Sequence, residues 1–197
     1  MFYPLPDALK LKARPIPRLF LPIKNLPTAH NDVFMKKYDK EEQKLMADWA
    51  ADCAERVLPF FEKAFPKDNR PRQAIQACRT WVRTGLFKMA EIRGASLAAH
   101  AAAREAKAGS AACFAARAAG QAAAAAHVSQ HAFGSAYYAL KATAAVDLPS
   151  AEKNVLEEQE RQVHLIATEL RQEVLKRVIV EKRTGGIFIK VQKGDDF

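Results

Sequence analysis

The stretch from Ala95 to Val146 constrains the fold more than any other part of the chain, because about half of its residues are alanine. Alanine has the highest helix propensity and loses almost no side-chain entropy, so the stretch is predicted to be helical. Its small side chains allow other helices to approach closely, but they bury too little apolar area to stabilise a helix alone. Larger side chains from both flanks must complete the core, which predicts an all-α fold.

Capping and helix-breaking residues divide the chain into about six helices, which we expect to form a compact bundle. Asp39 and Glu42 make a capping-box pattern at the start of the first helix, and Ser110 can cap the fourth. Residues 110–146 could form one helix or two, and we favour a break within residues 128–134. The six predicted helices begin near Asp39, Asn69, Met89, Ser110, Tyr137 and Ser150. The second is predicted to end at Gly85, and the last, with Leu156 on its inward face, at Gly185-Gly186.

The two ends of the chain differ from this helical domain, which we assign to residues 29–184. Residues 1–28 hold six of the ten prolines and are predicted to form an extended, basic, Pro-rich arm. The arm is either a solvated tail or a segment that lies on a partner, and its candidate contact residues are Lys10, Lys12, Arg14, Arg18 and Lys24. Residues 185–197 are predicted to be a short C-terminal tail. Residues 187–191 could form a strand in it, but the sequence predicts no second strand in the chain to pair with it.

The net charge of +9 is compatible with several kinds of partner. A basic arm could bind nucleic acid, an anionic surface or an acidic protein. The three cysteines, Cys53, Cys78 and Cys113, are widely spaced and are predicted to be free, packed thiols of a reducing compartment. With no convincing transmembrane segment or leader, we expect a soluble protein of the bacterial cytoplasm or of an organelle interior or matrix face, and not a secreted one.

Three histidines, His100, His127 and His131, are the candidates for chemistry. His127 and His131 stand one helical turn apart, which is the spacing by which a helix offers two imidazoles to a metal ion. A zinc-protease motif would need a glutamate directly after the first histidine, and Val128 occupies that position. We therefore expect histidines hydrogen-bonded within helix packing, with a metal site as the weaker alternative. The sequence predicts no catalytic residue and no cofactor, and a metal-dependent enzyme using these three histidines is kept only as a third hypothesis behind non-catalytic binding.

Several segments resemble a known family, the fifth-type immunity proteins of bacterial toxin systems. The resemblance extends over about residues 45–180 and is carried by Trp49–Leu58, Arg70–Trp81, Ala98–Arg104, Ala115–Gly120, Ala126–Ala132 and Tyr138–Ala142. It implies an all-helical fold and a non-catalytic role in binding protein. The polar residues in these segments are then either a buried framework or a recognition face, and we favour the framework: Asp52, Arg72, Arg79, Arg104, Arg117, His127 and His131.

Two functions follow as hypotheses. The first is a helical module that binds and neutralises a toxin. The second is an accessory structural subunit of a large assembly, a respiratory complex or a ribosome, including those of mitochondria. The terminal extensions distinguish them, because only an assembly subunit would need the arm for incorporation. In either case the partner is a protein, bound through the helical face or through the arm.

Overall fold

The computed structural model describes residues 38–192, and helix α4 (Ala111–Ala125) lies at its centre. Helices α1, α2, α3 and α5 all pack directly against α4. Apart from Cys113 and Gly120, every buried residue of α4 is alanine. Larger side chains would not fit on a helix with four close neighbours. The alanine-rich composition is therefore a consequence of the central position of this helix.

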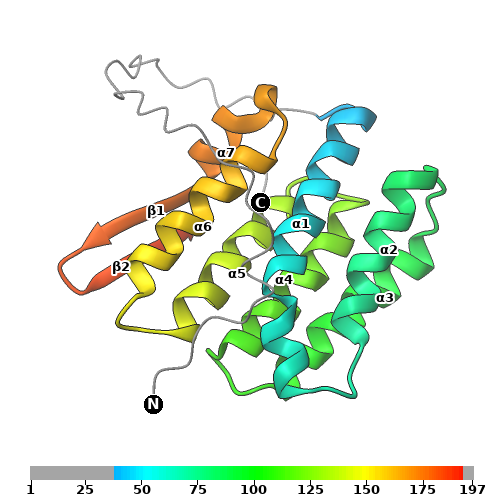
Figure 1. The fold of residues 1–197 in the computed structure, drawn as a ribbon. Helices are drawn as coiled ribbons and strands as arrows, with labels where there is room; N and C mark the ends of the chain where they lie inside the picture. The colour runs from blue at the N-terminus through cyan, green and yellow to red at the C-terminus, as the bar shows by residue number, and fades with distance from the viewer. Residues whose placement is uncertain (1–37, 193–197) are drawn as a thin grey trace.

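The remaining helices are arranged on either side of α1 and α4. In Figure 1, α2 and α3 lie on one side of these two helices, whereas α5 and then α6 lie on the other. The bounds are α1 Lys40–Ala64, α2 Arg70–Thr84, α3 Met89–Glu105, α5 His131–Val146, α6 Ala151–Leu165 and α7 Arg171–Arg177, with a single 3-10 turn at Thr168–Leu170. The prediction of an all-α bundle is confirmed. No helix within residues 38–192 is both long and apolar enough to cross a membrane.

Local signals placed most helix ends correctly. The Asp39–Glu42 capping box is present, and the Ser110 hydroxyl accepts a hydrogen bond from the backbone N–H of Cys113 at 3.2 Å. Residues 110–146 form two helices, as favoured, but the break lies at residues 126–130, so α5 begins at His131 and not near Tyr137. Asn69 precedes α2 but its side chain makes no capping bond. The neighbouring Asp68 carboxylate accepts the backbone N–H of Arg70 instead, at 3.0 Å.

Large side chains from the flanks of the alanine-rich region complete the core, as predicted. They include Trp49 and Phe61 of α1, Ile75 of α2 and Phe133 and Leu140 of α5. The rings of Trp49 and Phe133 meet edge to face, with 6.4 Å between their centroids. These residues bury the apolar area that the alanines cannot supply.

Helix α6 is attached to the bundle by buried polar side chains. Glu158 is 2% exposed and receives three hydrogen bonds from the Arg56 guanidinium of α1, at 2.9 to 3.0 Å. The indole N–H of Trp49 donates to the backbone carbonyl of Gln162 at 2.8 Å. A buried carboxylate requires such a partner. Leu156, predicted to face inward, is 48% exposed, because Val155, Glu158 and Gln162 form the buried side of α6.

The C-terminal region differs most from the prediction. The last helix does not continue to Gly185, because α6 ends at Leu165 and residues 178–191 form a hairpin. Strand β1 (Val178–Arg183) pairs in antiparallel fashion with β2 (Gly186–Val191), so the predicted strand does have a partner within the chain. The β-branched run Val178-Ile179-Val180 favours a strand over a helix. One face of the hairpin packs against the core through the aliphatic side chains Val178, Val180, Ile187, Ile189 and Val191.

The predicted arm, with Lys10, Lys12, Arg14, Arg18 and Lys24, lies outside the described residues. So do residues 193–197 of the predicted tail.

The central position of α4 gives a direct test. We expect Ala119→Leu to lower the free energy of unfolding by about 3 kcal/mol, because position 119 is fully buried and the added atoms must displace a neighbouring helix. Ala111→Leu, on the partly exposed side of the same helix, is the matched control and should cost much less. Urea denaturation measures both. Equal losses in the two variants would contradict the central packing of α4.

Candidate functional site

The side of α4 that is not covered by other helices faces solvent between α3 and α5, and it carries the largest side chains of the helix. Phe114, Arg117 and Gln121 are partly exposed there and contact residues of α5, while His100 of α3 lies against Gly120 of α4. We name the resulting area the cationic–aromatic surface. It consists of His100 and Arg104 of α3, Phe114, Arg117 and Gln121 of α4, and His131, Tyr137, Tyr138 and Lys141 of α5.

Two glycines bring the polar side chains of this surface between the helices. A Cβ atom at Gly120 would lie 2.8 Å from the Cε1 and Nε2 atoms of His100, so the imidazole occupies the space that a side chain would fill. In the same way, a Cβ at Gly134 would lie 2.7 Å from Oε1 of Gln121. The hydroxyl of Ser96 also donates to the Gly120 carbonyl at 2.9 Å. Gly120 therefore marks a close approach between α3 and α4, made chiefly by the His100 ring.

Aromatic rings hold the cations of the surface in place. The rings of Phe114 and Tyr138 are stacked with 6.3 Å between their centroids. The Lys141 ammonium lies 4.9 Å from the Phe114 centroid, and the Arg117 guanidinium carbon lies 5.8 Å from the Tyr138 centroid. Both distances are typical of cation–π contacts. The positive charges of α4 and α5 are therefore positioned by rings rather than by carboxylates.

The surface has an excess of positive charge that the described residues do not neutralise. Between Met89 and Val146 the only acidic residues are Glu91 and Glu105. Glu91 pairs with Lys88 at 2.9 Å, and Glu105 pairs with Arg70 of α2 at 2.5 Å. Within residues 38–192, none of the three cations of the surface, Arg104, Arg117 and Lys141, forms an ion pair.

The histidines of the surface are held in the neutral form. Burial lowers the pKa of His100, and the nearby charges of Arg117 and Arg104 lower it further. Burial also lowers the pKa of His131, with smaller contributions from His127 and His100. The Nδ1 atom of His131 lies 2.8 Å from Oε1 of Gln121, so it carries the proton and leaves Nε2 as an acceptor.

A second polar cluster lies between α1 and α2, and its charges are paired. Arg79 contacts the carboxylates of Asp48, Asp52 and Glu55 at 2.5 to 2.7 Å. Arg72 contacts Glu62 at 2.6 Å. These two arginines of α2 therefore pair with the acidic side chains of the helix that precedes them in the chain.

The sequence-derived set of polar residues is thus divided by the structure. Asp52, Arg72 and Arg79 belong to the paired cluster between α1 and α2. Burial raises the pKa of the Asp52 carboxyl although Arg79 acts in the opposite direction, as in a partly buried framework. Arg104, Arg117 and His131 lie together on the cationic–aromatic surface, and His127 lies beside it with its ring 5.4 Å from that of His131. The paired cluster between α1 and α2 resembles a framework, whereas the cationic–aromatic surface resembles a recognition face, and the two lie in different places in this fold.

The histidines considered for metal binding and the cysteines considered as nucleophiles lie where neither chemistry is favoured. His100, His127 and His131 stand near one another, but the part of the chain that the structure describes contains no group of three side chains able to hold a metal ion. Cys53, Cys78 and Cys113 are free and buried, as predicted. Burial raises the pKa of the Cys78 thiol to about 12 and that of Cys53 well above its usual value, which disfavours the reactive thiolate.

Sequence reasoning did not select Phe114, Gln121 and Tyr137 as members of a site. A signal was present, because Phe114, Arg117 and Gln121 are the only residues larger than cysteine in α4, and they recur at intervals of three and four. That spacing places them on one face of a helix. In a helix made otherwise of small residues, large side chains on one face mark the face that other helices do not cover.

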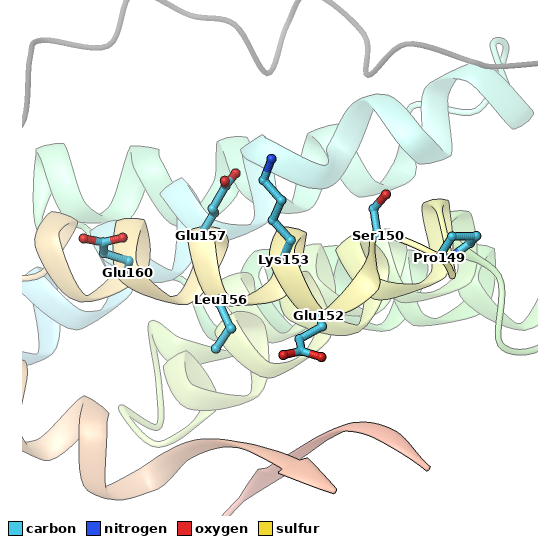
Figure 2. A pocket seen from close by; sticks show the side chains of 7 residues that line it. All are labelled: Pro149, Ser150, Glu152, Lys153, Leu156, Glu157 and Glu160. Carbon is cyan, nitrogen blue, oxygen red and sulfur yellow. The ribbon is translucent and has the colours of Figure 1, made fainter. Parts of the chain in front are cut away.

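An open hollow on α6 is a weaker candidate. It is lined by Pro149, Ser150, Glu152, Lys153, Leu156, Glu157 and Glu160. Figure 2 shows Lys153 and Glu157 pointing to one side of the helix while Leu156 and Glu152 point to the other. Glu152 is also engaged by Lys182 of β1, at 2.8 Å. The lining side chains do not converge on one point, so this hollow is not the better site.

Comparison with known proteins identifies one relationship. A family model described as Imm-5 like putative immunity protein matches residues 36–169, which include all helices from α1 to α6 and the whole cationic–aromatic surface. No curated protein and no solved structure matches the chain.

The contact between His100 and Gly120 can be tested by a double-mutant cycle. In the wild-type background, Gly120→Ala places a methyl group against the imidazole, so the gain in helix propensity should be cancelled by displacement of the ring. In a His100→Ala background the same change should stabilise the protein by about 1 kcal/mol. Thermal or urea denaturation gives the four values. An identical effect of Gly120→Ala in both backgrounds would show that the ring does not occupy this space.

The lowered pKa values predict a pH dependence of stability. Between the ordinary histidine pKa of about 6.5 and the lower folded-state values, the unfolded chain binds more protons than the folded one. The free energy of unfolding should therefore fall as the pH is lowered through about 6.5. Above about pH 7.5 these histidines should contribute no pH dependence to it. A His100→Asn/His131→Asn variant should lose part of this slope in denaturation curves collected across the range. A slope unchanged in the variant would assign the effect to other groups.

Proposed function

The chain belongs to the Imm-5 like putative immunity protein family, and on that basis we propose that it is a non-catalytic module that neutralises a bacterial toxin by binding it. The observation that carries the proposal is the family match, which spans six consecutive helices of one bundle. A neutralising protein acts by covering a surface of its target, and it needs a rigid face with side chains that remain available. The cationic–aromatic surface has these properties, because its side chains are fixed by rings and glycine contacts and its charges are unpaired within residues 38–192.

The environment of the histidines also supports binding over catalysis. General acid–base or nucleophilic catalysis by an imidazole normally uses a carboxylate or a backbone group to orient the ring and a nucleophile beside it. The described neighbours of His131 are the Gln121 amide and His127, and those of His100 are Gly120 and two arginines. Such neighbours keep the imidazoles neutral and able to accept hydrogen bonds from a partner.

The second candidate is an accessory structural subunit of a larger assembly. It is favoured by one observation, that the family match ends at residue 169 and the β1–β2 hairpin at residues 178–191 lies beyond it. The basic arm of residues 1–28 likewise lies outside the match. In this candidate the helical bundle is a family domain to which anchoring segments have been added.

Gentle isolation of the native, full-length protein with its partners distinguishes the two. We expect one protein at equal stoichiometry, retained when residues 1–28 are deleted, because a toxin binder acts through the helical domain. Mass spectrometry of the co-migrating proteins and the mass of the particle give the result. A particle of many subunits, lost on deletion of residues 1–28, would contradict toxin neutralisation and support the assembly subunit.

A further inference from the structure

We infer that the cationic–aromatic surface binds a carboxylate-rich segment of a protein partner, with Arg117 and Lys141 as the main contacts. The inference rests on the proposed function only in taking the occupant to be a protein. It adds the chemistry of the segment that is recognised and the side chains that recognise it.

The first argument is the contrast in charge pairing across the molecule. Arg56, Arg70, Arg72 and Arg79, all on α1 and α2, are each in contact with at least one carboxylate. The two carboxylates of the segment that forms the surface are both engaged outside it, by Arg70 and Lys88. Three cations are consequently left together on one area of α3, α4 and α5. An anionic group from another molecule would provide the counter-charge that the described residues do not.

The second argument is the preorganisation of Arg117 and Lys141. Both side chains are partly buried, and each lies over an aromatic ring. Partial burial strengthens an ion pair relative to one in bulk water, and a side chain that is already fixed loses less entropy on binding. The guanidinium of Arg117 can also present two parallel N–H donors to one carboxylate. These features favour the binding of a carboxylate at a defined position over the non-specific attraction of anions from solution.

The histidines fit the same role. Burial and the nearby charges of Arg117 and Arg104 lower the pKa of His100, and burial with smaller contributions from His127 and His100 lowers the pKa of His131, so both rings favour the neutral form. The cationic groups that face a ligand are then the two arginines and Lys141, while the unprotonated nitrogen of each neutral ring, Nε2 in His131, can accept from a backbone N–H group of the partner. A peptide segment offers both carboxylates and such donors.

Nucleic acid fits this surface less well than an acidic protein segment. Proteins that bind single strands use exposed aromatic faces on which bases stack, along a groove of cations that tracks the phosphates. Here Phe114 and Tyr138 stack on each other, and their rings are in contact with Lys141 and Arg117. The rings are thus occupied by the cations of the chain itself. The exposed Leu97, one turn before His100 on α3, adds an apolar contact suited to a protein.

The test uses the full chain, a fluorescent poly-glutamate peptide as the carboxylate probe and an oligothymidine of matched charge as the phosphate probe. The first variant is Arg104→Gln/Arg117→Gln/Lys141→Gln. The control is Lys67→Gln/Lys153→Gln/Lys176→Gln, which removes the same charge from exposed positions outside the surface. We expect the affinity for poly-glutamate, measured by fluorescence anisotropy, to fall by about tenfold or more in the first variant and by less than about twofold in the control.

An equal loss in both variants would overturn the inference, because it would show attraction to net charge and not to this surface. Tighter binding of oligothymidine than of poly-glutamate, abolished in the first variant, would also overturn it and assign the surface to nucleic acid. Arg117→Lys keeps the charge and removes the two-donor fork, so it should bind between the wild type and the triple variant. The outcome is separate from that of the co-isolation, since a protein partner can be recovered whether or not this surface selects carboxylates.

Discussion

The packing of α4 among four other helices is the constraint on which the rest of the structure depends. A helix with neighbours on nearly all sides can carry only small side chains, and α4 meets this requirement with alanine at almost every buried position. The apolar area must then come from elsewhere, so Trp49, Phe61 and Phe133 are supplied by α1 and α5. The one uncovered side of α4 is free to carry large residues. This is where Phe114, Arg117 and Gln121 occur.

The same arrangement separates the charges of the domain into two groups with different roles. Between α1 and α2, and between α1 and α6, arginines and carboxylates pair with one another and join helices, as in Arg79 with Asp52 and Arg56 with Glu158. On the other side, α3 and α5 flank the uncovered edge of α4 with few acidic residues, and the cations contact rings instead. The first group stabilises the fold. The second is available to a partner, which connects the packing of the central helix to the proposed binding function.

Much of the fold could be predicted from the sequence because its signals are local. The capping box at Asp39, the Ser110 cap and the left-handed Gly85 depend on neighbouring residues, and each appears where it was expected. The C-terminal region could not be predicted in this way. Glu158 and Gln162 look like solvent-facing residues until the Arg56 guanidinium and the Ala136 carbonyl are known to bond their side chains, so the buried side of α6 was misassigned.

The candidate site was accessible from the sequence only in part. His100 and His131 were selected as candidate metal ligands and Arg104 and Arg117 through the family resemblance, but a buried framework was favoured for all the arginines. Which arginines find a carboxylate depends on which helices are neighbours. Arg79 meets three carboxylates across the α1–α2 contact, whereas Arg117 faces Tyr138 of α5. That difference is a property of the three-dimensional arrangement and not of any local pattern.

The central claim is that the uncovered side of α4, with its flanks on α3 and α5, is where the partner binds. Hydroxyl-radical footprinting of the native complex against the free chain tests it most directly, because aromatic and imidazole side chains react readily when accessible. We predict reduced oxidation of Phe114, Tyr137 and Tyr138 in the complex, with Phe188 on the hairpin unchanged. Protection of Phe188, and none at Phe114 or Tyr138, would place the partner on the C-terminal hairpin and contradict the account.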